Sequence, residues 1–206
     1  AVELSSGDYT WEVQQVFDSR PPRIKEPMGP LVLQSFVGWR VELQEDYWTP
    51  NEMTLMDFNI PQNGFTQFMY VLPTGTKEAL VEMTRFGSEP LPHELASNHL
   101  RNYLLSPGLS FDIVHEERGT IPMTQYAEVK DQDARIVSTG ARAGKIKATT
   151  GYAFKSMFEH AKELASGIAQ ERKESSWLRL PKSEMDRFNF YDHLLLHILK
   201  HKPHWG

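Results

Sequence analysis

The sequence contains no cysteine, which excludes disulfide-stapled scaffolds, zinc sites built on thiolates, and cysteine nucleophiles. It has no excess of basic residues either, since 22 Lys and Arg stand against 27 Asp and Glu, a formal net charge of −5. A protein that coats a nucleic acid needs a basic surface, so that class is disfavoured. No apolar run reaches the roughly 20 residues that a bilayer-spanning helix requires.

What is present is typical of a folded domain. The chain has 206 residues, of which 40% are hydrophobic, and a mean hydropathy of −0.48. That length supports one large domain or two small ones with a real apolar core. The chain begins without Met or a basic-then-apolar leader and ends on Trp205-Gly206. We therefore expect a fragment of a longer protein, cut at both ends.

Runs rich in β-branched and aromatic residues predict a sheet. Five strands are expected, at residues 31–43, 53–60, 65–72, 78–86 and 109–117. Gly38 in the first of them indicates a β-bulge, and Gly119 is expected to follow the last. The third and fourth runs are separated by Pro-Thr-Gly-Thr-Lys, which predicts a β-hairpin.

Helical patterns dominate the second half of the chain. We expect helices at 93–105, 154–168 and 186–201, a short strand at 134–139, a polar loop at 170–183, and an extended turn at Pro21-Pro22. The apolar residues of the 154–168 segment fall on one helix face. The fold class is therefore α+β, a mainly antiparallel sheet followed by C-terminal helices. We expect residues 1–133 to form the sheet region, and residues 134–206 to form a strand-turn-helix unit with the last helices.

The hairpin decides which side chains share a face of the sheet. The register that we expect pairs Leu72 with Glu78, so that Phe68 lies opposite Glu82. Because side chains alternate along a strand, one face then carries Thr66, Phe68, Tyr70, Leu80, Glu82 and Thr84. An acid beside two aromatic rings suits a cationic intermediate, because ring faces attract positive charge by roughly 0.5–2 kcal/mol each.

Six short segments occur in a fixed order: Asp18-Ser19-Arg20-Pro21-Pro22, Met56-Asp57-Phe58, 68–73, 80–84, 116–123 and 140–152. Together they resemble the flavin-dependent lycopene cyclases of carotenoid biosynthesis, of the bacterial and plant type. The resemblance covers nearly the whole chain. It implies a fold like that of FAD-dependent oxidoreductases, in which residues 1–133, the sheet region with one helix, bind the substrate and residues 134–206 face the flavin.

The resemblance implies acid catalysis with no net redox change. A carboxylic acid protonates a linear end of lycopene, a nearby double bond attacks the carbocation, and loss of a proton leaves a β-ionone ring. The enzyme class would be isomerase, as an intramolecular lyase. Two alternatives stay open: a related flavoprotein oxidoreductase acting on another isoprenoid, and a non-catalytic domain that binds apolar ligands, in which Glu82 is merely a surface residue.

The resemblance assigns the catalytic acid to Glu82. Plant members read F-L-E-E-T where this chain has residues 80–84, so the first Glu of that motif maps to Glu82 and the second is Met83 here. An apolar wall would keep the carboxyl neutral by raising its pKa. Glu117 is either a further carboxylate near the site or a solvated residue before a turn. The predicted substrate-binding residues are Phe68, Tyr70, Leu80 and Thr84.

The resemblance also implies a cofactor, FAD in its reduced form, with NADPH as the reductant. The predicted cofactor-binding residues are Gly140, Ala143, Gly144 and Thr150. A strand, glycines and a helix N-terminus suit an anionic ring, although a plain strand-turn-helix would explain the same glycines. None of the 13 glycines forms G-x-G-x-x-G. We therefore expect that this chain lacks the ADP-binding half of the site and is inactive alone.

Three histidines, His193, His197 and His201, stand four residues apart. That spacing suits a metal, but no carboxylate pattern accompanies it, so we expect no metal site. We expect instead an amphipathic helix whose inward side chains are Leu194, Leu195, Ile198 and Leu199. The resemblance further implies a carotenoid substrate, no nucleic-acid partner, and a cytoplasmic location peripheral to the membrane that stores the carotenoid.

Overall fold

The computed structural model describes residues 1–20, 29–125, 133–169 and 182–205, with the backbone alone for 182–186. The chain divides into two compact units. We call Pro30–Met123 with Leu194–Gly206 the sheet unit, and Ala1–Gly29 with Thr124–His193 the second unit. The predicted turn at Pro21-Pro22 and most of the predicted polar loop at 170–183 lie outside the described residues.

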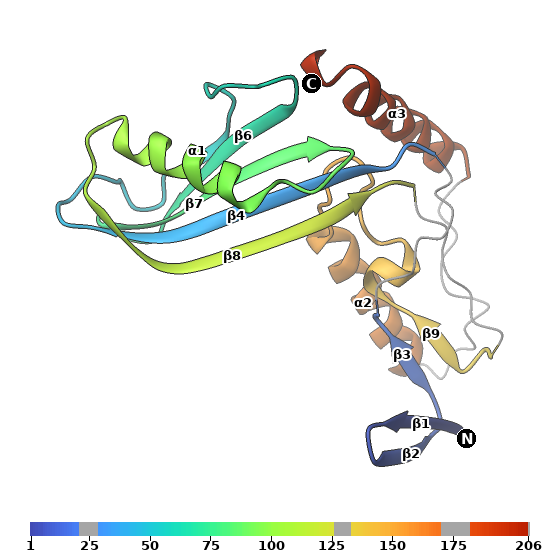
Figure 1. The fold of residues 1–206 in the computed structure, drawn as a ribbon. Coiled ribbons are helices and arrows are strands. Elements are labelled where there is room, and N and C mark those ends of the chain that lie inside the picture. Colours follow the sequence, from blue (N-terminus) through green and yellow to red (C-terminus); the bar gives the residue numbers. More distant parts are fainter. Residues whose placement is uncertain (21–28, 126–132, 170–181, 206) are drawn as a thin grey trace. The chain divides into compact units, whose positions relative to one another are not determined.

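The sheet unit is built on one five-stranded sheet (Figure 1). Its strands are β4 (Val32–Leu43), β5 (Thr54–Asp57), β6 (Thr66–Pro73), β7 (Glu78–Gly87) and β8 (Phe111–Met123). They lie in the order β5-β6-β7-β4-β8, and every neighbouring pair is antiparallel. The five predicted strands therefore form one antiparallel sheet, which confirms the prediction and the α+β class.

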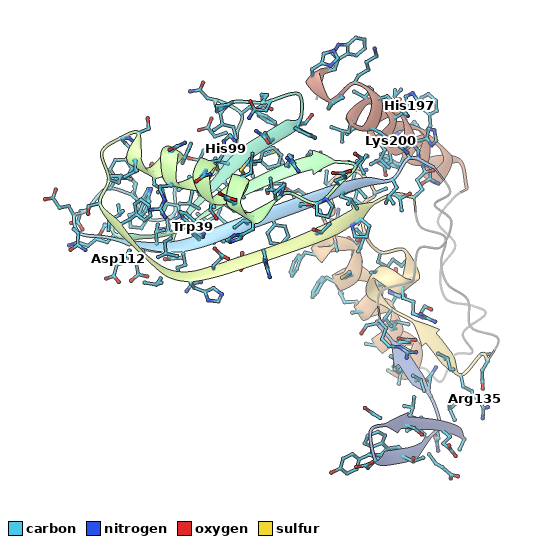
Figure 2. All side chains as sticks on the ribbon, in the orientation of Figure 1. Trp39, His99, Asp112, Arg135, His197 and Lys200 are labelled. Atoms are coloured by element: carbon cyan, nitrogen blue, oxygen red, sulfur yellow. The ribbon has the colours of Figure 1, made fainter. Side chains whose placement is uncertain are left out.

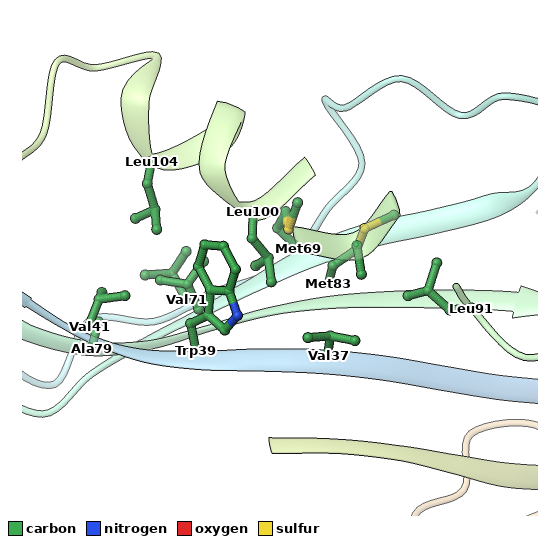
Figure 3. Close-up of a cluster of buried hydrophobic side chains, with 12 residues drawn as sticks. Val37, Trp39, Val41, Met69, Val71, Ala79, Met83, Leu91, Leu100 and Leu104 are labelled. Carbon is green, nitrogen blue, oxygen red and sulfur yellow. The ribbon is translucent and has the colours of Figure 1, made fainter. Parts of the chain in front are cut away.

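One face of this sheet is covered by helix α1 (His93–Leu105), whose bounds match the predicted helix (Figure 1). The buried cluster between them contains Val37, Trp39, Val41, Met69, Val71, Ala79, Val81, Met83, Leu91, Ala96, Leu100 and Leu104 (Figure 3). Its helical members stand four residues apart, so they form one stripe. Because strand side chains alternate, the residues between the strand members, including Glu82, lie on the opposite face of the sheet.

Strands β6 and β7 form the predicted hairpin in a register that differs by two residues from the expected one. Leu72 pairs with Leu80 rather than with Glu78, and Tyr70 therefore lies opposite Glu82. Glu78 closes the turn instead, since its carbonyl accepts hydrogen bonds from two loop amides at 2.9 and 3.2 Å. A shift of two residues leaves each side chain on its predicted face. The shared face is thus confirmed, while the expected pairing of Phe68 with Glu82 is wrong.

Strand β8 continues past its predicted end and includes Gly119. Gly119 pairs with Phe36 of β4, and a Cβ added to it would come within 2.5 Å of Cζ in the Phe36 ring. The glycine therefore permits a close approach between strands rather than a turn. The bulge expected at Gly38 is also misplaced. Gly38 pairs regularly, and the register shifts between Arg40 and Val41.

Replacement of Gly119 by alanine tests this packing. Gly119→Ala is expected to lower the free energy of unfolding by about 1–3 kcal/mol, because the new methyl group must displace the Phe36 ring. Urea titration measures the change. Gly75→Ala is the matched control, since a Cβ there meets only the Glu78 Cβ, at 4.0 Å, and a surface change of this kind costs less than about 0.5 kcal/mol. Equal effects of the two substitutions would refute the argument.

The second unit contains two small strand pairs and helical segments. Strands β1 (Val2–Ser6) and β2 (Tyr9–Val13) form a hairpin, and β3 (Val16–Asp18) pairs in parallel with β9 (Ile136–Ser138). Helix α2 spans Phe154–Ala169. The β3–β9 pair joins the start of the chain to residues far along it, so the compact units do not follow the boundary predicted between 133 and 134. The functional roles given to the two predicted parts stay a prediction.

Two helices pack differently from the expectation. The periodic face of α2 is largely exposed, with Phe154 85% and Phe158 57% accessible. Helix α3 (Lys182–His201) is followed by the short helix η3 (Pro203–Trp205). Leu194 and Leu195 of α3, predicted to point inward, are exposed. Leu199, also predicted to point inward, is buried, and Ile198 is half-buried. Asp192 and Leu196 of the same helix are buried as well, and they were not predicted.

Candidate active site

Glu82 lies in the middle of β7, on the sheet face opposite helix α1. Its neighbours across the sheet are Tyr70 on β6 and Gly38 on β4. The Thr84 hydroxyl, two residues along the strand, donates a 2.8 Å hydrogen bond to Glu82 Oε1. Within the part of the chain that the structure describes, no ion pair involves Glu82. A neutral donor therefore orients this carboxyl without fixing it in the charged form.

The predicted substrate-binding residues surround Glu82 on the same face. Tyr70 lies directly opposite, and Phe68 pairs with Thr84. The rings of Phe68 and Tyr70 meet edge to face, with centroids 5.1 Å apart, and Leu80 precedes Glu82 by two residues. Phe58 has no predicted role, yet its ring lies 5.2 Å from that of Phe68. The sequence offered one signal for Phe58: it belongs to Met56-Asp57-Phe58, one of the six segments that carry the resemblance.

The surroundings of Glu82 favour its neutral form. Burial raises the pKa of this carboxyl, the hydrogen bond from Thr84 opposes that increase, and the negative charge of Glu117 adds to it. A carboxyl that stays protonated can donate a proton, which is what a general acid must do. The geometry and the direction of the pKa shift therefore both suit general acid catalysis.

The two adjacent glutamates of β8 lie on opposite faces of the sheet. Glu117 lies on the same face as Glu82, across strand β4 from it. Glu116 lies on the helix side, where it accepts a 2.9 Å hydrogen bond from Trp39 Nε1 and lies 2.8 Å from His93 Nε2. The hydrogen bond from Trp39 is the main cause that lowers the pKa of Glu116. Glu116 thus ties α1 to the sheet, and neither glutamate stands in a loop.

The predicted cofactor residues gather in the second unit, around the short helix η1 (Gly140–Ala143). Gly140 and Gly144 have φ values of +57° and +67°, a left-handed conformation that favours glycine. Gly144 ends the helix by donating a 3.0 Å backbone hydrogen bond to Ala141. Ala143 is the last residue of η1. Since α2 begins only at Phe154, the glycines are not joined directly to a long helix, contrary to the predicted strand–glycine–helix arrangement.

Two carboxylates hold the segment that contains these residues. Asp18 of β3 lies 3.2 Å from Arg142 of η1, at one end of the segment. Asp192 of α3 accepts hydrogen bonds from Lys147 Nζ at 2.6 Å and from Thr149 Oγ1 at 3.0 Å, at the other end. Thr150, the last predicted cofactor residue, follows directly. These contacts fix the backbone on which the predicted cofactor residues lie. Sequence reasoning missed them because Arg142 is remote from Asp18, and Lys147 and Thr149 are remote from Asp192, along the chain.

The surroundings of Asp18 predict that the stability of the second unit depends on pH. The pKa of Asp18 falls from 3.8 to about 2, chiefly through the hydrogen bond from Arg20, with attraction by Arg142 adding to it. A lowered pKa gives stability that is present above the ordinary value and is lost as the pH falls toward 2. Asp18→Asn is therefore expected to cost roughly 1–2 kcal/mol near neutral pH, and the difference from wild type should shrink in acid. Urea titrations at several pH values measure it.

Asp133→Asn is the matched control for this prediction. Asp133 also has a lowered pKa, through its hydrogen bonds with Arg135, but this ion pair is exposed and joins residues two positions apart. Such a pair is screened by water and is partly retained in the unfolded chain. Asp18 makes an equally local pair with Arg20, so the difference between the two variants reports the added contact of Asp18 with Arg142. A larger loss of stability for Asp133→Asn than for Asp18→Asn would contradict the role given to the Asp18–Arg142 contact.

The structure thus brings Glu82 together with all four predicted substrate-binding residues in the sheet unit, whereas the four predicted cofactor residues belong to the second unit. No group of three or more His, Asp or Glu side chains is placed to hold a metal ion among the residues described. In the same residues, no helix is long and apolar enough to cross a membrane. Figure 2 shows the side chains of both units.

The fold of this chain is similar to that of a protein whose structure has been solved. A geranylgeranyl bacteriochlorophyll reductase-like protein from Thermoplasma acidophilum superimposes with a TM-score of 0.56 at 12% identity, over 90% of this chain and 50% of that one. The likeness shows the fold alone. The particular family follows from the sequence: the model of the lycopene cyclase protein family matches residues 1–199. The chain belongs to that family.

The curated relatives to which this chain is similar are described as lycopene beta-cyclases. The lycopene beta-cyclase of Pantoea ananas is 29% identical over 125 residues, which are 58% of this chain and 32% of the relative. The lycopene beta-cyclase of Pseudescherichia vulneris is 30% identical over 126 residues, with the same coverage. This chain therefore spans about a third of the length of the curated relatives that it matches.

Proposed function

We propose that the protein to which this chain belongs is a lycopene β-cyclase, an isomerase of the intramolecular lyase type. The observation that carries the proposal is the position of Glu82, a partly buried carboxyl with a raised pKa on an aromatic sheet face, in a chain of the lycopene cyclase family. The names of the relatives supply the substrate class, a linear carotenoid.

Glu82 acts as the proton donor in this proposal. Its O–H proton is transferred to a terminal double bond of the polyene, whose π electrons form the new C–H bond and leave a tertiary carbocation. A second double bond then attacks that cation and closes the ring, and loss of a ring proton gives the β-ionone end group. Tyr70 and Phe68 lie beside the acid, where ring faces stabilise positive charge by roughly 0.5–2 kcal/mol each.

Residues 140–144 fit a position against a flavin ring. Four of these five residues are Gly or Ala, and all five are partly accessible, so a planar ring can approach the backbone closely. We therefore assign Gly140, Ala143, Gly144 and Thr150 to one wall of the FAD site. Reduced FAD, with NADPH as its reductant, would supply negative charge that stabilises a nearby cation. The carboxylates of Asp18 and Asp192 would keep this wall in place.

Cellular placement belongs to the same proposal. Lycopene is an apolar polyene, so an enzyme that acts on it must meet it at the membrane where it is stored. We propose that the protein lies in the cytoplasm, peripheral to that membrane, and that this chain alone, which spans about a third of its relatives, does not retain FAD or cyclise lycopene.

Expression of the full-length protein in a bacterium that accumulates lycopene tests the function. Cyclic carotene with β-ionone rings, identified by chromatography and mass spectrometry, is the expected product. An acyclic product with fewer double bonds would instead indicate an oxidoreductase that acts on isoprenoids. Unchanged lycopene in the presence of folded, flavin-loaded protein would overturn the proposal.

A further inference from the structure

We propose that Glu117 is a positioning residue for the catalytic acid: across the gap left by Gly38, its carboxylate makes Glu82 retain its proton. The inference rests on the proposed function, because it concerns the acid of that reaction. It adds a neighbouring negative charge to burial as a cause that favours the protonated form of this carboxyl. It also gives a role to a strand glycine and a strand glutamate that the reaction itself does not use.

Strand pairing brings the two glutamates to one place. Gly38 of β4 pairs with Glu82 of β7 on one side and with Glu117 of β8 on the other. The three residues form one row across the sheet, on the face opposite α1. In such a row the side chain of the central residue normally separates its two neighbours. With glycine at the centre, the central residue itself places no side chain between them.

The Glu117 side chain occupies that gap. A Cβ added to Gly38 would lie 3.2 Å from Glu117 Cγ and 3.5 Å from Glu117 Oε1. On its other side the same Cβ would lie 3.2 Å from Leu80 Cδ1, on the strand that carries Glu82. The Glu117 carboxylate therefore extends over β4 toward β7. Its negative charge adds to the increase in the pKa of Glu82.

Other titratable and charged groups face this row. Within the sheet unit, Tyr70 lies opposite Glu82 on β6, and the pair of Arg40 with His115 lies one step along the same face of β4 and β8. Arg40 and Glu117 are both exposed, so water weakens both charges, and the Glu117 carboxylate is distinguished by its position over Gly38, directly beside the strand that carries Glu82. Two carboxyls that share a site cannot both ionise freely, and one of them retains its proton.

The matched set of variants is Glu117→Gln, Gly38→Ala and Glu116→Gln in the full-length protein. Glu117→Gln removes the charge and keeps the shape. Gly38→Ala keeps the charge but displaces the Glu117 side chain. Glu116→Gln changes the adjacent carboxyl, which lies on the helix side of the sheet. The first readout is the titration of Glu82, followed by the infrared absorption of its protonated carboxyl and assigned by its loss in Glu82→Gln.

Glu117→Gln is expected to lower the titration midpoint of Glu82 by about 0.5–1 pH unit, a threefold to tenfold smaller protonated fraction above both midpoints. Gly38→Ala should shift it in the same direction, and Glu116→Gln should leave it unchanged. The second readout is the rate of cyclisation against pH. For Glu117→Gln its alkaline limb should move to lower pH by the same amount, with the rate in acid retained.

The outcomes separate this inference from the proposed function. A shifted Glu82 titration in a protein that forms no cyclic carotene would support the coupling and contradict the cyclase assignment. An active cyclase whose Glu82 titration is the same with and without the Glu117 carboxylate would overturn the coupling. A rate that falls equally at every pH in Glu117→Gln would also overturn it, because that pattern indicates a merely structural role.

Discussion

Glu82→Gln is expected to reduce cyclisation by at least about a hundredfold in the full-length protein, since general acids contribute roughly 10²–10⁴-fold. Glutamine keeps the shape and the hydrogen-bonding partner Thr84 but has no carboxyl proton to donate. Folding and flavin binding should be retained. The measurement is the carotenoid composition of lycopene-accumulating cells, together with the visible spectrum of the purified variant.

Two further variants sharpen this result. Glu82→Asp should also be severely impaired, because one methylene fewer withdraws the carboxyl by about 1.5 Å from its target carbon. Glu116→Gln is the matched control, because it makes the same Glu-to-Gln change on the other face of the sheet, where the carboxyl is hydrogen-bonded to Trp39 and His93. Near wild-type cyclisation in Glu82→Gln would refute the assignment and leave Glu117 as the next candidate for the acid.

Faces of strands were predictable from the sequence, whereas partners across strands were not. Alternation alone places Glu82, Tyr70 and Phe68 on one face, and the structure agrees. The register depends on how the turn is closed, and Glu78 closes it by accepting two loop hydrogen bonds, which composition does not reveal. The position of Glu117 beside Gly38 could not be predicted for a similar reason. It depends on strand order, because β4 lies between β7 and β8.

Contacts remote in sequence account for the rest of what was missed. Strand β3 has three residues, too few for a periodic pattern, and is defined by its parallel partner β9. The Asp18–Arg142 contact follows from that pairing. On helix α3 the apolar residues surround much of the circumference, so periodicity did not decide which of them would be buried. The glycines were misread for a related reason. The sequence predicted a bulge at Gly38 and the end of a strand before Gly119, but both glycines lie within strands, where they let a neighbouring side chain approach the backbone closely.

Position 83 shows that alternation also limits where a second acid can act. The plant pattern F-L-E-E-T has a glutamate where this chain has Met83. Met83 is fully buried and pairs with Met69 and Val37 in the cluster beneath α1. It therefore points away from the face that carries Glu82. In this chain a carboxyl at position 83 would enter the apolar core and would not join the acid.

Met83→Glu is accordingly expected to destabilise the protein by about 3–5 kcal/mol or to prevent folding near neutral pH, because an unpaired charge would be buried in an apolar cluster. The introduced carboxyl would have a raised pKa in the folded state, so its destabilising effect is largest above that pKa and decreases as the pH falls toward the unfolded value. Met83→Leu preserves volume and should cost less than about 1.5 kcal/mol. Met83→Gln should be destabilising by an amount that does not vary with pH. Urea titrations across pH distinguish the three variants, and a Met83→Glu protein as stable as Met83→Leu would show that position 83 does not lie in the core.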